Sequence, residues 1–171
     1  MWFATGHNDL SFIEQAPHHL ESVGVIPASA ARVFALLSNG ETQKEWFQDF
    51  VACRWTCSAP YGVGSTREIE LKMLTVKERF LVWEPGRRLS FAVDAITVPL
   101  VRGMVEDMQL EPLSDSSTLL RWRAYYDPTL IMRGIHPIGR AVFGQMFRAS
   151  TDGLAKYAAR FVGPHPPAPS P

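Results

Sequence analysis

Hydrophobic and polar residues alternate along the segment from Gly62 to Val93, and this period of two predicts three successive β-strands joined by tight reversals. The face that carries Ile69 and Phe80 also carries Arg67 and Glu78. A charged side chain that points toward a core needs an oppositely charged partner or a polar cavity. The pattern therefore predicts a cavity beside the sheet.

A reversal at residues 73–74 would place Ile69 opposite Glu78 and Arg67 opposite Phe80. Arg67 and Glu78 are then diagonal neighbours on one face, roughly 7–8 Å apart at Cα and within side-chain reach. Two interpretations stay open. The pair is either a partly buried structural salt bridge, or a polar pair that orients a ligand, with Glu78 as a general acid or base of raised pKa.

The rest of the chain predicts the other elements by period and by the residues that begin and end helices. Ser29 is expected to cap a helix, and apolar residues at three- and four-residue spacing predict a long amphipathic helix near the C-terminus. In chain order we expect a strand over 20–26, a helix that ends at Asn39-Gly40, a short helix over 42–47, a strand over 51–57, the three strands within 62–93, strands over 102–111 and 118–126, and a helix from Pro137 to Phe161.

This order predicts an α+β helix-grip fold. Successive strands joined by short turns form an antiparallel sheet, here of about seven strands, with two short helices after the first strand. The long C-terminal helix must bury its apolar face against that sheet. If the sheet curves around the helix, a space between the two is expected.

Composition and charge exclude several functional classes. The 171 residues, 46% hydrophobic and 20% charged, suit one globular domain, and the zero net charge does not favour binding to nucleic acid. No apolar run reaches the roughly 20 residues of a membrane-spanning helix, and we expect no signal peptide. Cys53 and Cys57 lie about 13 Å apart on a strand, beyond disulfide reach, which favours free thiols and a cytoplasmic location.

No motif in the sequence predicts a metal, nucleotide or other cofactor, and no hydrolase elbow is present. His18 and His19 are adjacent on a strand and point to opposite faces, so they do not hold one ion together. His136 is expected to be a cap or loop residue before the long helix. We therefore expect neither metal nor cofactor.

Several segments, taken in order, resemble one known superfamily. They are Val25–Ser29, Val33–Leu37, Trp46, Gly62–Arg67, Glu78, Trp83–Phe91, Leu110–Pro112 and Thr118–Trp122. The chain is similar here to the SRPBCC (START-like or Bet v 1-like) superfamily, and most of all to its polyketide cyclase/dehydrase branch. The resemblance covers residues 18–162, which we interpret as a ligand-binding domain between an N-terminal arm (1–17) and a Pro-rich tail (163–171) expected to be disordered. It implies a deep, mostly apolar cavity for a hydrophobic small molecule, and it carries over no shared catalytic motif.

Further residues of the strands and the last helix share the inward face. Glu106 has the parity of Met104 and Met108, so it is either a second carboxylate at the cavity mouth or a strand-end residue near solvent. Tyr126 is expected to line the core and could hydrogen-bond a ligand. For Trp122, Phe91, Phe143, Phe147 and the methionines the alternative interpretation is ordinary core packing. The residues predicted to line a ligand site are Arg67, Ile69, Glu78, Phe80, Phe91, Met104, Met108, Trp122, Tyr126, Phe143, Met146 and Phe147.

Three functions remain open from the sequence. The first is binding of a hydrophobic small molecule, such as a polyketide, lipid, isoprenoid or aromatic compound. The second is a cyclase or dehydratase in which Glu78 or Glu106 transfers protons and Arg67 stabilises an oxyanion. The third is a protein-interaction module with a collapsed cavity. The sequence indicates no oligomeric state.

Overall fold

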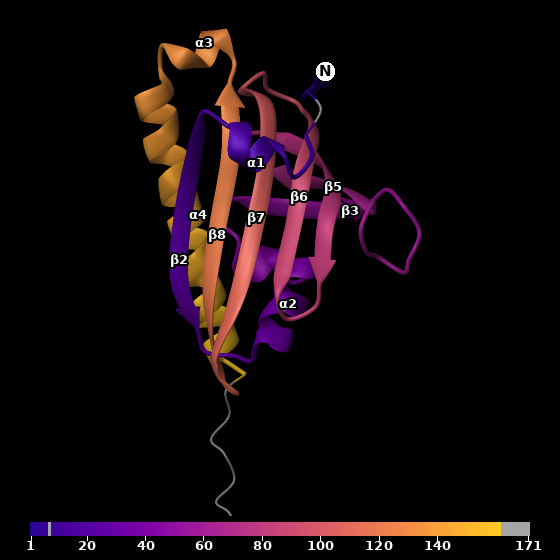
Figure 1. Cartoon of the computed structure of the whole chain (residues 1–171), viewed down its shortest axis with the longest axis vertical. Helices are drawn as coiled ribbons and strands as arrows, with labels where there is room; N and C mark the ends of the chain where they lie inside the picture. Colours follow the sequence, from indigo (N-terminus) through magenta and orange to yellow (C-terminus); the bar gives the residue numbers. More distant parts are fainter. Residues whose placement is uncertain (7, 162–171) are drawn as a thin grey trace, which may run out of the picture.

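A curved, unclosed antiparallel sheet forms the body of the protein, and a long C-terminal helix lies along one face of it (Figure 1). The computed structural model describes residues 1–6 and 8–161. Seven strands follow the order β2-β8-β7-β6-β5-β4-β3, and β1 pairs with β6. The strands are β1 (Phe3–Ala4), β2 (His18–Ile26), β3 (Phe50–Trp55), β4 (Thr66–Leu71), β5 (Thr75–Glu84), β6 (Arg88–Ile96), β7 (Val101–Ser114) and β8 (Ser117–Pro128).

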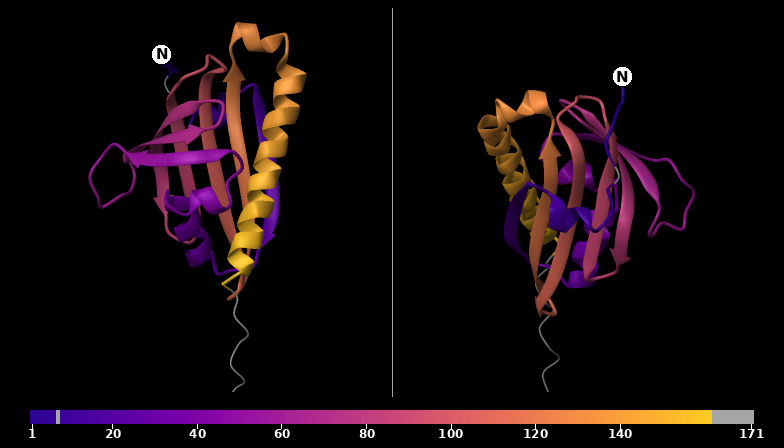
Figure 2. Two further views of the ribbon diagram at one scale, coloured as in Figure 1. Left: turned by 180° about the vertical axis from the view of Figure 1, so that it is seen from behind. Right: turned by 45° about the horizontal axis from the view of Figure 1, so that its top comes forward.

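The helices confirm the helix-grip fold predicted from the sequence. In the left view of Figure 2 the long helix lies in front of the sheet, along β2 and β8, with the short helices after β2 beside its lower half. Ser29 caps the first of these, accepting a hydrogen bond from the Arg32 amide, as predicted. The helices are α1 (Phe12–Gln15), α2 (Ala30–Ser38), the 3₁₀ turn η1 (Gln43–Glu45), α3 (Leu130–Arg133) and α4 (His136–Ala159).

The register of the β4–β5 hairpin differs by two residues from the prediction. The reversal places Lys72 and Met73 at the turn, where the Leu71 and Leu74 backbones hydrogen-bond to each other. Arg67 therefore lies directly opposite Glu78 rather than diagonal to it. A shift of two preserves the period of a strand, so the prediction of which side chains share a face was unaffected.

The described residues of the N-terminal arm cross the upper end of the sheet, on the face opposite α4 (Figure 1). The Asn8 side-chain amide donates to the Val93 carbonyl oxygen at 3.0 Å, and the Gly6 amide donates to the Arg102 carbonyl oxygen at 2.7 Å. The predicted disorder of the tail, residues 163–171, lies outside the described residues.

The second half of α4 is fixed to the rest of the protein by close contacts. A Cβ atom on Gly153 would lie 2.3 Å from the Trp46 carbonyl oxygen, so only glycine permits this approach. The Ser150 hydroxyl accepts from the Gln48 amide at 3.0 Å, and the hydroxyls of Thr151 and Ser22 are 2.8 Å apart. These contacts set the distance between helix and sheet.

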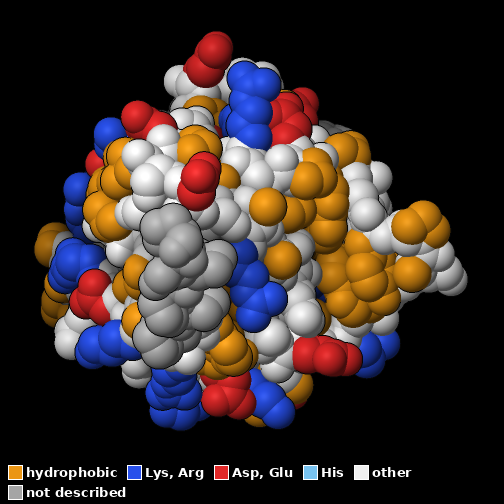
Figure 3. Space-filling model, turned by 90° about the horizontal axis from the view of Figure 1, so that it is seen from below, with side chains coloured by type: hydrophobic (Ala, Val, Ile, Leu, Met, Phe, Trp, Pro, Cys, Tyr) orange, Lys and Arg blue, Asp and Glu red, His pale blue; other side chains and the backbone are white. Residues whose placement is uncertain are grey.

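Two hydrophobic clusters fill most of the interior. The larger lies between α2, α4 and the sheet and includes Trp46, Trp122 and Phe147, and the smaller is formed by Ile69, Val76, Val93 and Ile96. Burial of each such large side chain contributes about 1.5–3 kcal/mol to folding. Seen from below, charges of both signs are scattered over the surface, and hydrophobic side chains gather toward the loop between β3 and β4 (Figure 3). Among the described residues, no helix combines the length and the hydropathy that crossing a bilayer requires.

Candidate functional site

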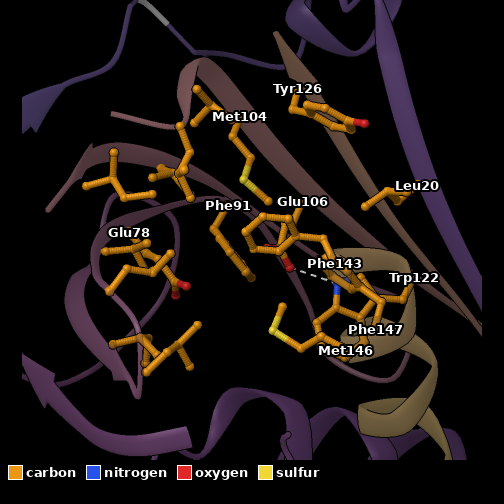
Figure 4. Close-up of a pocket in the computed structure, with 18 of the residues that line it drawn as sticks. Leu20, Glu78, Phe91, Met104, Glu106, Trp122, Tyr126, Phe143, Met146 and Phe147 are labelled. Carbon is orange, nitrogen blue, oxygen red and sulfur yellow. Dashed lines mark hydrogen bonds between the residues drawn. The ribbon is translucent and has the colours of Figure 1, made fainter. Parts of the chain in front are cut away.

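A cavity of about 110 Å³ lies between the two hydrophobic clusters, bounded by the inner face of the sheet and by α4 (Figure 4). Cavities that hold drug-sized ligands usually measure about 300–1,000 Å³, so a ligand of that size requires wall side chains to move. Four methionines in the wall have the flexible side chains for such movement. They are Met104, Met108, Met132 and Met146.

The buried ion pair between Arg67 and Glu78 forms one end of the cavity. The Arg67 Nε donates to Glu78 Oε2 at 2.7 Å, and the two side chains are only 2% and 7% exposed. Burial raises the pKa of Glu78, while the Arg67 guanidinium acts in the opposite direction. Each charge thus depends on the other for its stability in a dry environment.

Aromatic rings surround the Arg67 guanidinium on several sides. Its Cζ atom lies 4.9 Å from the ring centre of Phe80, 5.6 Å from that of Phe91 and 5.7 Å from that of Trp55. Cation–π attraction strengthens when the cation is desolvated, as it is here. The Nη1 atom of Arg67 is buried and has no hydrogen-bond partner among residues 1–6 and 8–161. Such a donor favours an added acceptor, because an unsatisfied buried N–H is costly.

Glu106 is a second buried carboxyl group in the same cavity. Its Oε2 accepts a hydrogen bond of 2.8 Å from Trp122 Nε1, drawn as a dashed line in Figure 4. Burial first, and then the negative charge of Glu78, raise the pKa of Glu106 to about 8, although the Trp122 bond and Arg67 oppose the shift. At neutral pH Glu106 is therefore predominantly protonated, beside the hydrogen-bonded Arg67–Glu78 pair.

The structure places the predicted ligand-lining residues around this cavity with one exception. Phe80 does not line it: the Arg67 guanidinium lies over the Phe80 ring, and Phe80 packs instead against Trp55 and Trp83. Glu106 lies inside the cavity and is 8% exposed, so it is neither at the mouth nor near solvent. Whether these residues contact a ligand stays a prediction.

The outer end of the cavity contains residues that sequence reasoning missed. His136 is the first residue of α4 rather than a cap or loop residue, and its Nε2 lies 2.8 Å from the Tyr126 hydroxyl. His18 lies opposite Tyr126 in the β2–β8 register. In the sequence, only the four-residue spacing of His136 and Arg140, which puts both on one helix face, could have indicated this group. The contacts themselves join segments that are far apart in the chain and leave no local pattern. Other unpredicted wall residues include Leu20, Gln43, Trp46, Phe47, Leu100, Val101 and Met132.

No group of three or more His, Cys, Asp or Glu side chains with metal-binding geometry occurs within the described part of the chain. At its inner end the site holds the Arg67 guanidinium and two carboxyl groups, Glu78 bonded to Arg67 and Glu106 bonded to Trp122, beside an apolar wall.

Comparison with known proteins places these features in a family. A sequence profile described as polyketide cyclase/dehydrase and lipid transport matches residues 17–159. Uncharacterised proteins of Mycobacterium tuberculosis and Mycobacterium bovis are 27% identical over 105 residues, which are 61% of this chain and 63% of those proteins. The match thus spans less than two thirds of these relatives.

Solved structures share the fold at low sequence identity. A START superfamily protein from Mycobacterium smegmatis has a TM-score of 0.73 and 14% identity, and the match covers 85% of this chain and 99% of that one. The Zhui aromatase/cyclase from Streptomyces sp. R1128 has a TM-score of 0.74 and 15% identity, with 86% and 96% covered. The di-domain aromatase/cyclase BexL has a TM-score of 0.68 and 19% identity, with 85% and 47% covered.

The ion pair gives a first prediction. Arg67→Met should lower the free energy of unfolding by about 3–5 kcal/mol, because Glu78 remains buried without its counterion. The double variant Arg67→Met/Glu78→Leu should recover at least half of that loss, as measured by urea denaturation. The control is Arg54→Met, which breaks the surface pair with Glu68 and should cost less than about 1 kcal/mol. Equal losses for Arg67→Met and Arg54→Met would contradict a buried, mutually dependent pair.

Glu106 gives a second prediction. Because its pKa rises from 4.5 to about 8 on folding, the folded state holds a proton that the unfolded state has released between these pH values. Stability should therefore fall as the pH rises through this window, with a slope of up to about 1.4 kcal/mol per pH unit from this group. Glu106→Gln should remove that part of the slope in urea denaturation measured from pH 5 to pH 8. The prediction fails if the slopes of the two proteins are identical.

Proposed function

Because the chain belongs to the polyketide cyclase/dehydrase and lipid transport family, we propose that it binds a hydrophobic small molecule in the cavity between the sheet and α4. The observation that carries the proposal is the cavity itself, an apolar space with buried polar groups at defined positions. An apolar wall supplies affinity, and a few fixed polar groups orient the ligand. The ligand class is a polyketide, lipid, isoprenoid or aromatic compound.

Arg67 has the role of orienting such a ligand. Its Nη1 donor would hydrogen-bond a carbonyl or hydroxyl oxygen of the ligand. The presence of the cavity also argues against the third interpretation of the sequence, a collapsed interior that serves only for protein contacts.

The binding proposal is tested with N-phenylnaphthylamine, an uncharged dye that fluoresces in apolar surroundings. We expect the wild-type protein to bind it. Met104→Trp, which fills the middle of the cavity, should weaken binding at least ten-fold. Leu113→Trp, at an exposed position of β7 away from the cavity, is the control and should bind like the wild type. Absence of dye binding to the wild type, or equal binding to both variants, would refute the proposal.

A second candidate function, dehydration of a β-hydroxy carbonyl compound, is favoured by the different partners of the two carboxyl groups, because Glu78 is paired with Arg67 whereas Glu106 is bonded to Trp122 and has a pKa raised to about 8. Glu78, acting in its ionised form, would remove a proton from the carbon beside the substrate carbonyl, and Arg67 Nη1 would stabilise the enolate oxygen. The protonated Glu106 would give its proton to the leaving β-hydroxyl group, which departs as water as the carbon–carbon double bond forms. Proton exchange with solvent then restores both carboxyl groups. The Zhui and BexL proteins, which share the fold, are described as aromatase/cyclases.

The dehydratase candidate is tested with the β-hydroxy ketone formed from benzaldehyde and acetone, whose dehydration gives an enone with strong ultraviolet absorbance. We expect turnover that falls above about pH 8 as Glu106 loses its proton. Glu106→Gln retains an acceptor for Trp122 and should lower kcat at least about 100-fold.

The matched control is Glu111→Gln, an exposed carboxylate on the same strand, which should leave kcat unchanged. Turnover by Glu106→Gln at the wild-type rate would exclude the general-acid role. That result would not affect the binding proposal, which the dye titration tests separately.

A further inference from the structure

The outer end of the cavity brings together polar side chains from three elements. Tyr126 on β8 and His136 at the start of α4 are joined by the 2.8 Å contact between the Tyr126 hydroxyl and His136 Nε2. The His18 ring, on β2, lies with its centre 4.2 Å from that of His136. Tyr126 and His136 line the cavity. We call Tyr126, His136, His18 and Arg140 the rim cluster.

Arg140 adds a full positive charge to this cluster. It lies one helical turn after His136, lines the cavity and is exposed to solvent. In the part of the chain that the structure describes, no carboxylate forms an ion pair with Arg140. The acidic group of this region, Asp127, instead pairs with Arg102 at 2.6 Å and with Arg133 at 3.6 Å.

The surroundings of the rim are also positive. The sequence from Pro128 to Phe147 contains Arg133 and Arg140 and no Asp or Glu. The pKa of His18 is lowered by burial and by the charges of His136, Arg140 and Arg133, with only Asp127 acting in the opposite direction. A group at this position therefore experiences a field that favours anions.

The opposite end of the cavity has the reverse property. The positive charge of Arg67 is already paired with Glu78, and the negative charge of Glu78 contributes to the raised pKa of Glu106. An anionic ligand group placed there would meet the same repulsion. A ligand with one anionic end thus has one favourable orientation in the cavity, with the anion at the rim and the uncharged end near Arg67.

We infer that the rim cluster is a binding subsite for an anionic group, and that the ligand class is an amphiphile with a carboxylate, sulfonate or phosphate at one end of an apolar body. This inference rests on the proposed binding function. Arg140 provides the charge, while His136 and the Tyr126 hydroxyl provide hydrogen bonds. The apolar body passes Met104 and Phe143 toward the Arg67–Glu78 pair.

The test compares two dyes that differ in one group. Anilinonaphthalene sulfonate carries a sulfonate on the aromatic body of the uncharged N-phenylnaphthylamine. In fluorescence titrations of the full chain, we expect the wild type to bind the sulfonate dye more tightly than the uncharged one. Arg140→Gln should reduce the ratio of the two affinities about ten-fold, and Arg140→Lys should reduce it less, because the charge remains.

The control is Arg148→Gln, which removes the same charge from the same helix at an exposed position that does not line the cavity, and which should keep the wild-type ratio. An equal change for Arg140→Gln and Arg148→Gln, or no change for either, would overturn the subsite while leaving binding of the uncharged dye intact. Failure of the wild type to bind either dye would instead overturn the cavity-binding function, and the subsite with it. Because Arg140 is exposed, its replacement is not expected to unfold the protein.

Discussion

The desolvated pair of Arg67 and Glu78 is the constraint on which the interior depends. Two charges away from water are stable only if they contact each other and polarisable neighbours. Here the contact is a 2.7 Å hydrogen bond, and the neighbours are the aromatic rings around the guanidinium. Together with burial, the charge on Glu78 raises the pKa of Glu106, so the pair also acts on the second carboxyl group of the cavity.

The cavity lies between α4 and the sheet, on the N-terminal side of the contacts that fix the second half of the helix. Gly153 fixes α4 against the Trp46 backbone, and the Ser22–Thr151 contact fixes it against β2. Between these contacts and the β4–β5 hairpin, the side chains of α4 reach the sheet only in part. Flexible methionine side chains line the cavity, so the cavity volume can change by side-chain movement without the breaking of backbone hydrogen bonds.

The sequence was sufficient for the fold and for the faces of the strands, because both follow from local periodicity. The period of two placed Arg67, Glu78 and Glu106 on the inner face, and a register error of two residues in the hairpin left that unchanged. It was insufficient for contacts between distant segments. Phe80 has the inward parity but lies behind Arg67, and His136 meets Tyr126 only because α3 reverses the chain between them. These arrangements depend on packing in three dimensions, which the residue spacing along one strand does not predict.

The attachment of α4 is unequal along its length. Its fully buried residues begin at Gly144, whereas Ile138 and Val142 on its first turns are 68% and 61% exposed. The free energy needed to open a segment locally rises with the apolar contacts that it must break. The first turns of α4 and the adjoining α3 therefore form the weak side of the enclosure. The dissociation rate of a bound molecule would depend on how often this end of α4 frays. That rate is separable from the overall stability of the sheet.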